Sequence, residues 1–393
     1  MFAHLLPCLL QLLTVLGAEV PAGNHESTSS CLLQQGKRIT PDRLAHEAAD
    51  PYSAALELES DAEKDLQDPT WQWWLDLPEV DDQPASVKLA ILLLIKNEVG
   101  NAKAWLDWIR SARRHGLHLE LLIHASGIGP KEQENATATW PAEFRQSLLP
   151  QRAHTTWCDI VNAQVLLMRS AMTDPAISHM VFVDTASIPV ELPWVIYEQL
   201  ALASESRFCK SKHEKRAETW SLIRRSHARL LVDNHDGLRK QLLDKLHLVS
   251  EDLDPGQVCL EEVVWRWPLV LRDRRRQDMG NLSQLMDSCV MFVDWQITRN
   301  PTKRRRDWEG GFDHCEDCDA LRACNRAKEA QLAHPATFGT LTQPAFQELL
   351  RSPFWFARKF EDGAMSEEVL DTADSTWRAL SQGALFSHGK QHR

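Results

Sequence analysis

The chain has 393 residues, of which 43% are hydrophobic, enough for one large domain or two ordinary ones with a substantial core. Its formal net charge of -11 argues against nonspecific nucleic-acid binding as the main activity, because neutralising phosphates needs a positive face. The 15 tryptophans against 2 tyrosines indicate carbohydrate as a natural ligand class, since indoles stack well on C–H-rich ligands. For any single tryptophan, a place in the core is the better expectation.

Residues 1–18 have the pattern of a leader. An apolar run from Leu5 to Leu16 is followed by the small residues Gly17 and Ala18, which is typical of a secretory signal peptide. The run is too short for a comfortable transmembrane span, but it lacks a basic start, so an uncleaved signal anchor stays open. Either alternative places the rest of the chain in the secretory pathway: the Golgi lumen or membrane, or the exterior after secretion.

Residues 19–85 lack sustained apolar periodicity and carry an acidic stretch from Glu57 to Asp82, which predicts a stem or linker. Trp71, Trp73 and Trp74 are out of place in such a stretch. Docking of the end of the stem onto the following domain, residues 86–393, would explain them.

The cysteine content agrees with an oxidising compartment. Outside the leader the cysteines are even in number and could all pair: Cys31, Cys158, Cys209, Cys259, Cys289, Cys315, Cys318 and Cys324. His314, Cys315 and Cys318 have the spacing of half a zinc site, but no second Cys-X-X-Cys completes it, so a disulfide-stapled loop is favoured. Asn135 and Asn281 begin Asn-X-Ser/Thr triplets, which predict glycosylation in that compartment.

Two basic clusters interrupt the acidic balance of the chain. They run from Arg272 to Arg276 and from Lys303 to Arg306. We interpret both as solvated loop charges, with a role facing a phosphate or a partner as the alternative.

From Val87 onward, strands are expected to alternate with helices. Continuous apolar runs predict strands over 87–95, 119–123 and 179–184, and helical spacing of apolar residues predicts helices over 101–114, 160–172 and 192–202. The fold class is therefore α/β with a mainly parallel sheet. Open sheets of this kind bind ligands at the carboxyl ends of their strands, which draws attention to His124, Ser126 and Asp184.

A short aromatic run after Pro353 ends in two cations, Arg358 and Lys359. The run predicts a buried strand, and a cationic pair at its tip could reach an anion such as phosphate in a cleft. An ordinary strand with a solvated polar end is the alternative.

Paired carboxylates, Glu261 and Glu262, precede Trp265 at the start of an apolar helix-like segment. A carboxylate in a tryptophan-lined cleft can have a raised pKa and act as a general base. The alternative is that acidic residues are simply favoured in a first helical turn by the helix dipole.

Four motifs, taken in order, resemble those of the core-2/I-branching glycosyltransferases, glycosyltransferase family 14. They are Glu261-Glu262-X-X-Trp265, the strand end Phe292-Val293-Asp294-Trp295, His334-Pro335-Ala336-Thr337-Phe338, and Phe356-Ala357-Arg358-Lys359-Phe360. The resemblance covers residues 88–364 and is closer to the plant-type branch than to the animal β-1,6-N-acetylglucosaminyltransferases. Weaker matches include Trp220 and the sequence from Leu122 to Ser126.

The resemblance implies an inverting transferase with a GT-A-like mixed, mainly parallel sheet. It would move a sugar of the GlcNAc, xylose or glucuronic acid class from a UDP-sugar to a hydroxyl of a glycan or glycoprotein, with no cofactor and no divalent metal. The implied site residues are Glu262 as catalytic base, Lys359, Arg358, His124 and His334 at the donor, and Trp265 and Trp295 at the acceptor.

This sequence departs from the family at two positions. Ser126 stands where the animal enzymes carry an acidic residue for the nucleoside, and Thr185 stands where plant relatives often carry an acid. The Asp-X-Asp of a metal-dependent transferase is incomplete at Asp184, which also predicts metal independence.

Other functions stay open beside the transferase. A catalytically inactive, secreted carbohydrate-binding relative is the main alternative, but such a binder has no need of a base opposite a leaving-group cation. A sulfo- or phosphotransferase of another α/β scaffold would need a Gly-rich phosphate loop, which follows neither early strand.

Overall fold

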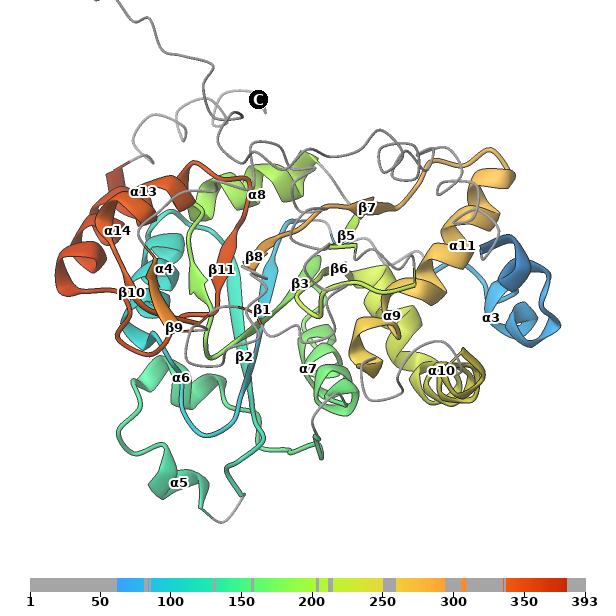
Figure 1. Ribbon diagram of the computed structural model, residues 1–393, viewed down its shortest axis with the longest axis horizontal. Helices are drawn as coiled ribbons and strands as arrows, with labels where there is room; N and C mark the ends of the chain where they lie inside the picture. The colour runs from blue at the N-terminus through green and yellow to red at the C-terminus, as the bar shows by residue number, and fades with distance from the viewer. Residues whose placement is uncertain are drawn as a thin grey trace, which may run out of the picture. The chain divides into compact units, whose positions relative to one another are not determined.

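The computed structural model describes residues 62–80, 84, 86–129, 132–156, 159–202, 205–210, 215–249, 259–293, 305–308, 335 and 337–379 (Figure 1). The chain divides into two units, residues 1–57 and 58–393, and every described residue belongs to the second. The leader, most of the stem, and the His314 to Cys324 cluster lie outside the described residues. Within the described residues, no helix is long and apolar enough to cross a membrane.

A six-stranded mixed sheet forms the centre of the second unit, in the order β2-β1-β3-β6-β5-β7. The pairs β1 with β2, β1 with β3, and β5 with β7 are parallel, whereas β6 runs antiparallel to both β3 and β5. The predicted α/β class with a mainly parallel sheet is confirmed at this level. The strands are β1 (Leu89–Ile95), β2 (Leu119–Ala125), β3 (His179–Asp184), β5 (Ser206–Phe208), β6 (Leu222–Arg224) and β7 (Leu285–Asp287).

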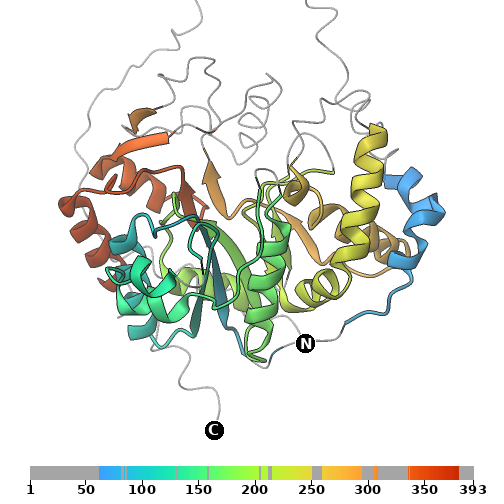
Figure 2. The same cartoon turned by 90° about the horizontal axis from the view of Figure 1, so that it is seen from below.

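The first half of this sheet follows the predicted strands and helices closely. Helices α4 (Ala102–Arg114), α7 (Val161–Met172) and α8 (Pro193–Leu202) lie where apolar spacing predicts them. Helix α7 and helix α9 (Arg225–Asp233) cover one face of the sheet, and α4 and α8 cover the other (Figures 1 and 2). Strand β1 is buried along almost its whole length because it lies between two parallel neighbours beneath these helices.

The aromatic run after Pro353 forms β11 (Phe356–Arg358), the central strand of a three-stranded sheet with β4 (Ile188–Pro189) and β8 (Met291–Val293). The predicted buried strand is confirmed: Phe356 is fully buried and stacks on Trp105 with ring centroids 5.6 Å apart. A two-stranded parallel sheet joins β9 (Arg305–Trp308) to β10 (Thr337–Leu341), and α13 (Gln343–Leu350) and α14 (Glu367–Ala379) follow.

Residues 62–80 pack against helix α11 (Arg266–Asp278), beside α10 (His235–Val249), as the blue segment in Figure 2 shows. This segment contains the short helices η1 (Pro69–Trp71) and α3 (Gln72–Leu75). Trp71 and Trp74 are fully buried, and the Trp74 indole donates to the Pro268 carbonyl at 2.7 Å. These indoles therefore belong to the core of the second unit.

The interpretation of Arg272 to Arg276 as loop charges is wrong, because these residues lie on α11, and Arg272, Arg275 and Arg276 bind the segment at residues 62–80. Arg272 donates to the carbonyls of Trp74 and Leu77 at 2.7 and 2.9 Å, and Arg276 pairs with Glu79 at 2.7 Å. In the second cluster, Arg305 and Arg306 belong to β9 rather than to a loop. Basic side chains of α11 therefore pair with acidic side chains of the segment at residues 62–80.

A disulfide joins Cys209, which follows β5, to Cys289, which precedes β8. It connects the six-stranded sheet to the three-stranded sheet. Cys259 is also disulfide-bonded.

Candidate functional site

Charged and aromatic side chains converge where β3 and β11 end. The Arg358 guanidinium donates to the Asp184 carboxylate at 2.7 Å and lies over the Trp220 ring, 4.5 Å from its centroid. The other Asp184 oxygen accepts from the Ser187 hydroxyl at 2.5 Å and from the Ala186 amide at 3.1 Å. Asp184 is therefore committed to protein donors on both of its oxygens.

Lys359 lies immediately beyond this ion pair. Its carbonyl accepts from the Phe338 amide at 2.8 Å, and the next amide, that of Phe360, donates to Ala186 at 2.8 Å. Burial lowers the pKa of Lys359, and the nearby Arg358 charge lowers it further, whereas Asp184 raises it. These backbone hydrogen bonds hold Lys359 in place just beyond the end of β11, and its side chain is half-buried there.

Thr185 joins the turns that follow β1 and β3. Its hydroxyl donates to the Glu98 carbonyl at 3.0 Å and accepts from the Gly100 amide at 2.8 Å. Gly100 is required here, because a Cβ at this position would lie 2.3 Å from the Thr185 carbonyl oxygen. Thr185 therefore has a structural role, because it joins the two turns.

Glu262 ends a single 3-10 turn, η3 (Leu260–Glu262), and three residues separate it from α11. The Arg216 side chain donates to its Oε2 through Nε at 2.9 Å and also through Nη2. The Glu262 carbonyl accepts from the Ala217 amide at 2.8 Å, so residues 216 and 217 hold both its side chain and its backbone. The Glu262 side chain keeps 14% of its surface exposed, so it is mostly covered where it meets Arg216.

Glu261 has a different environment from its neighbour. It is buried, and burial raises its pKa to about 7, with smaller contributions from the charges of Glu262 and Asp159. The two adjacent carboxylates therefore differ in environment: Glu261 is buried with a raised pKa, and Glu262 is paired with Arg216.

The segment at residues 215–221 connects the two groups of candidate residues. Arg216 binds Glu262 at one end, and Trp220 lies under Arg358 at the other. Because an extended chain spans at most about 3.6 Å per residue, four residues place the Cα atoms of Arg216 and Trp220 within about 14 Å of each other. The segment therefore links Glu262, which Arg216 binds, to Arg358, which lies over Trp220.

Trp265 and His124 are both buried. The Trp265 indole, expected at the acceptor, is 1% exposed and donates to Gln164 at 2.7 Å, so it supports the turn that carries Glu262 and has no open face for stacking. His124, expected at the donor, is 1% exposed, and its Nε2 accepts from the Ala153 amide at 3.0 Å. Burial lowers the pKa of His124, which keeps the ring neutral as it holds the turn at Ala153 against β2.

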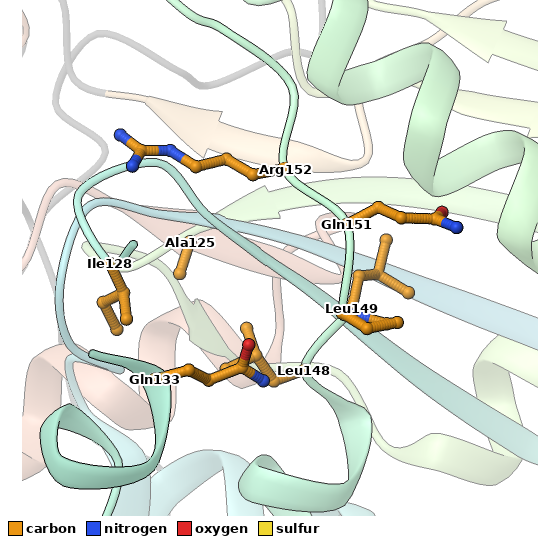
Figure 3. A pocket seen from close by; sticks show the side chains of 8 residues that line it. Ala125, Ile128, Gln133, Leu148, Leu149, Gln151 and Arg152 are labelled. Atoms are coloured by element: carbon orange, nitrogen blue, oxygen red, sulfur yellow. The ribbon is translucent and has the colours of Figure 1, made fainter. Parts of the chain in front are cut away.

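A shallow pocket lies at the carboxyl end of β2, and Figure 3 shows its lining. Arg152 extends from this lining and donates to the carbonyl of Ser126. The pocket is lined by Ala125, Ile128, Gln133, Leu148, Leu149, Pro150, Gln151 and Arg152.

Two expected site residues, His334 and Trp295, lie outside the described residues. Sequence reasoning missed Arg216, which binds Glu262, and the pairing of Arg358 with Asp184. Arg216 stands in a polar stretch of mixed charge with no motif of its own, so only the folded contact reveals it.

Among the described residues, no three or more His, Cys, Asp or Glu side chains gather as metal ligands would. No protein-family model matches this chain, and no curated protein sequence matches it.

Proposed function

We propose that the protein is an inverting glycosyltransferase that moves a sugar from a UDP-sugar to a hydroxyl of a glycan or glycoprotein. The observation that carries the proposal is the segment at residues 215–221. One end of it binds the Glu262 carboxylate through Arg216, and at its other end Trp220 lies under Arg358, which directly precedes Lys359. A carboxylate base and a leaving-group cation are the two groups that transfer of a sugar from a nucleotide needs. The motif resemblance to family 14 supports the same conclusion and assigns a GT-A-like fold.

In the proposed reaction, the acceptor oxygen attacks the anomeric carbon while the bond from that carbon to the diphosphate oxygen breaks. Glu262 accepts the hydroxyl proton, and attack from the face opposite the leaving group inverts the configuration. Arg216 holds the carboxylate through two bonds to Oε2, which fixes its orientation toward the acceptor.

Lys359 meets the negative charge that develops on the departing diphosphate. A half-buried ammonium group interacts more strongly with that charge than a fully solvated one would, because water screens it less. Arg358 is the second cation of this end, and its bond to Asp184 fixes where the guanidinium lies.

Metal independence is part of the proposal. Both oxygens of Asp184, the acid closest to the position of an Asp-X-Asp, bind protein donors. The Arg358 side chain already supplies a positive charge at that carboxylate, which is the place a divalent cation would otherwise take.

The experiment is a donor screen with the full chain, measuring UDP released from UDP-GlcNAc, UDP-xylose and UDP-glucuronic acid, with and without a chelator. Turnover of one donor should survive chelation. Activity lost with the chelator and restored by manganese would overturn the metal-free assignment. Glycan binding without release of UDP from any donor would instead support the carbohydrate-binding alternative.

A further inference from the structure

The segment at residues 62–80 carries a carboxylate, Asp65, that the proposed chemistry does not use. Asp65 is 9% exposed although it lies in the part of the chain that precedes the first strand of the sheet. A buried carboxylate needs partners to offset the loss of its hydration, so its contacts indicate what it organises.

Asp65 binds three side chains, each from a different distant stretch. Its Oδ2 accepts from the Lys215 ammonium at 3.0 Å and from the Trp267 indole at 2.9 Å. Its Oδ1 pairs with Lys245 at 3.3 Å. Lys215 and Trp267 also meet each other, with the ammonium 5.0 Å from the centroid of the indole. The Oδ2 atom of Asp65 therefore links Lys215 to Trp267 in the first turn of α11.

Two of these stretches, those that contain Lys215 and Trp267, also build the surroundings of Glu262. Lys215 directly precedes Arg216, which binds the Glu262 carboxylate, and the Ala217 amide donates to the Glu262 carbonyl. Trp267 lies five residues beyond Glu262, in the helix that its turn begins. Asp65 therefore connects Lys215 to α11. This connection supports the contact of residues 216 and 217 with Glu262, which orients the candidate base.

We propose that Asp65 is a positioning residue for Glu262, so that the segment at residues 62–80 belongs to the catalytic unit and not to a passive stem. The inference rests on the proposed function for its catalytic consequence. Its structural content, that Asp65 maintains the contact between residues 215–217 and η3, can be tested without any activity.

The variant is Asp65→Asn in the full chain, which keeps the shape of the side chain and removes the charge that binds Lys215. Asp68→Asn is the matched control. Asp68 lies in the same segment and shares the partner Lys245, but its other bond is to the Thr70 amide and not to Lys215 or Trp267. A general weakening of the docked segment should affect both variants alike.

With a donor that turns over, Asp65→Asn should lower kcat by roughly tenfold to a hundredfold, the scale of a misplaced catalytic group, while the KM for the donor stays within about twofold. Asp68→Asn should leave kcat within about twofold of the parent. Equal losses of kcat in the two variants would overturn the positioning role.

Hydrogen exchange of the Ala217 amide separates this inference from the proposed function. In Asp65→Asn we expect this amide to exchange at least about tenfold faster, whereas in Asp68→Asn its rate should match that of the parent. If no donor is turned over, the proposed function fails and the exchange result alone decides the inference. Unchanged exchange of Ala217 in Asp65→Asn, or equal acceleration in both variants, would overturn it.

Discussion

The two ends of the segment at residues 215–221 are built in different ways. The cation end comes from a contiguous motif on β11, which a buried aromatic strand holds against β4 and β8. The base end is assembled from residues far apart in the sequence: Asp65 pairs with Lys215, and the adjacent Arg216 pairs with Glu262. The ion pair of the cation end, Arg358 with Asp184, thus stands on a packed strand, whereas the base end depends on ion pairs that a single substitution can break.

The largest effect is expected from a substitution at the base end. Glu262→Gln keeps the size of the side chain but removes the proton acceptor, so turnover should fall by about 10²–10⁴-fold while UDP binds nearly as in the parent. Single-turnover kinetics and calorimetric titration with UDP would measure the two separately. A Glu262→Gln protein with parental turnover would remove Glu262 from the mechanism.

At the cation end, Lys359→Ala should raise the barrier of the reaction by roughly 3–4 kcal/mol, which is the scale of one electrostatic donor. The same substitution should also weaken the binding of UDP.

Because the pKa of Lys359 is lowered, its ammonium group loses its proton at a lower pH than that of an ordinary lysine. UDP affinity should therefore decline on the alkaline side, and Lys359→Arg should move that decline to higher pH. A titration with UDP across alkaline pH checks this, and identical profiles for the two proteins would contradict it.

The smallest expected effect concerns the difference in environment between the adjacent carboxylates of Glu261 and Glu262. Glu261 has a pKa of about 7 in the fold against an ordinary value of 4.5, so the folded state binds more protons than the unfolded state between these values. The free energy of unfolding should therefore fall as pH rises through this window, by up to roughly 3 kcal/mol, and level off above it.

Glu261→Gln should remove most of this decline while leaving turnover close to that of the parent. Denaturant unfolding at several values of pH, together with the donor assay, measures both. If Glu261→Gln abolished turnover and Glu262→Gln were silent, the assignment of the base would move by one residue.

The parts of the molecule that sequence reasoning predicted best are those governed by local periodicity. The apolar run of β1 and the helical spacing of α4 need no distant partner to be recognised. The ion pairs between Arg216 and Glu262 and between Arg358 and Asp184 join residues 46 and 174 positions apart, and no local pattern marks them. The sequence also placed Trp265 and His124 at the ligands, whereas both are buried. The residue type alone does not distinguish a tryptophan or histidine that binds a ligand from one that packs in the core.

The docked segment at residues 62–80 has a consequence for synthesis of the protein. Trp74 and Trp267 form bonds to partners that lie 194 and 202 residues away along the chain, so the segment is made long before the helix that covers it. At about 5–20 residues per second, a ribosome needs roughly 10–40 s to supply α11. During that interval Trp71 and Trp74 lack their final surroundings, and contacts so distant in sequence form slowly. The segment is therefore translated well before α11 and yet is among the last parts to reach its native place, which makes it the point at which folding assistance would matter most.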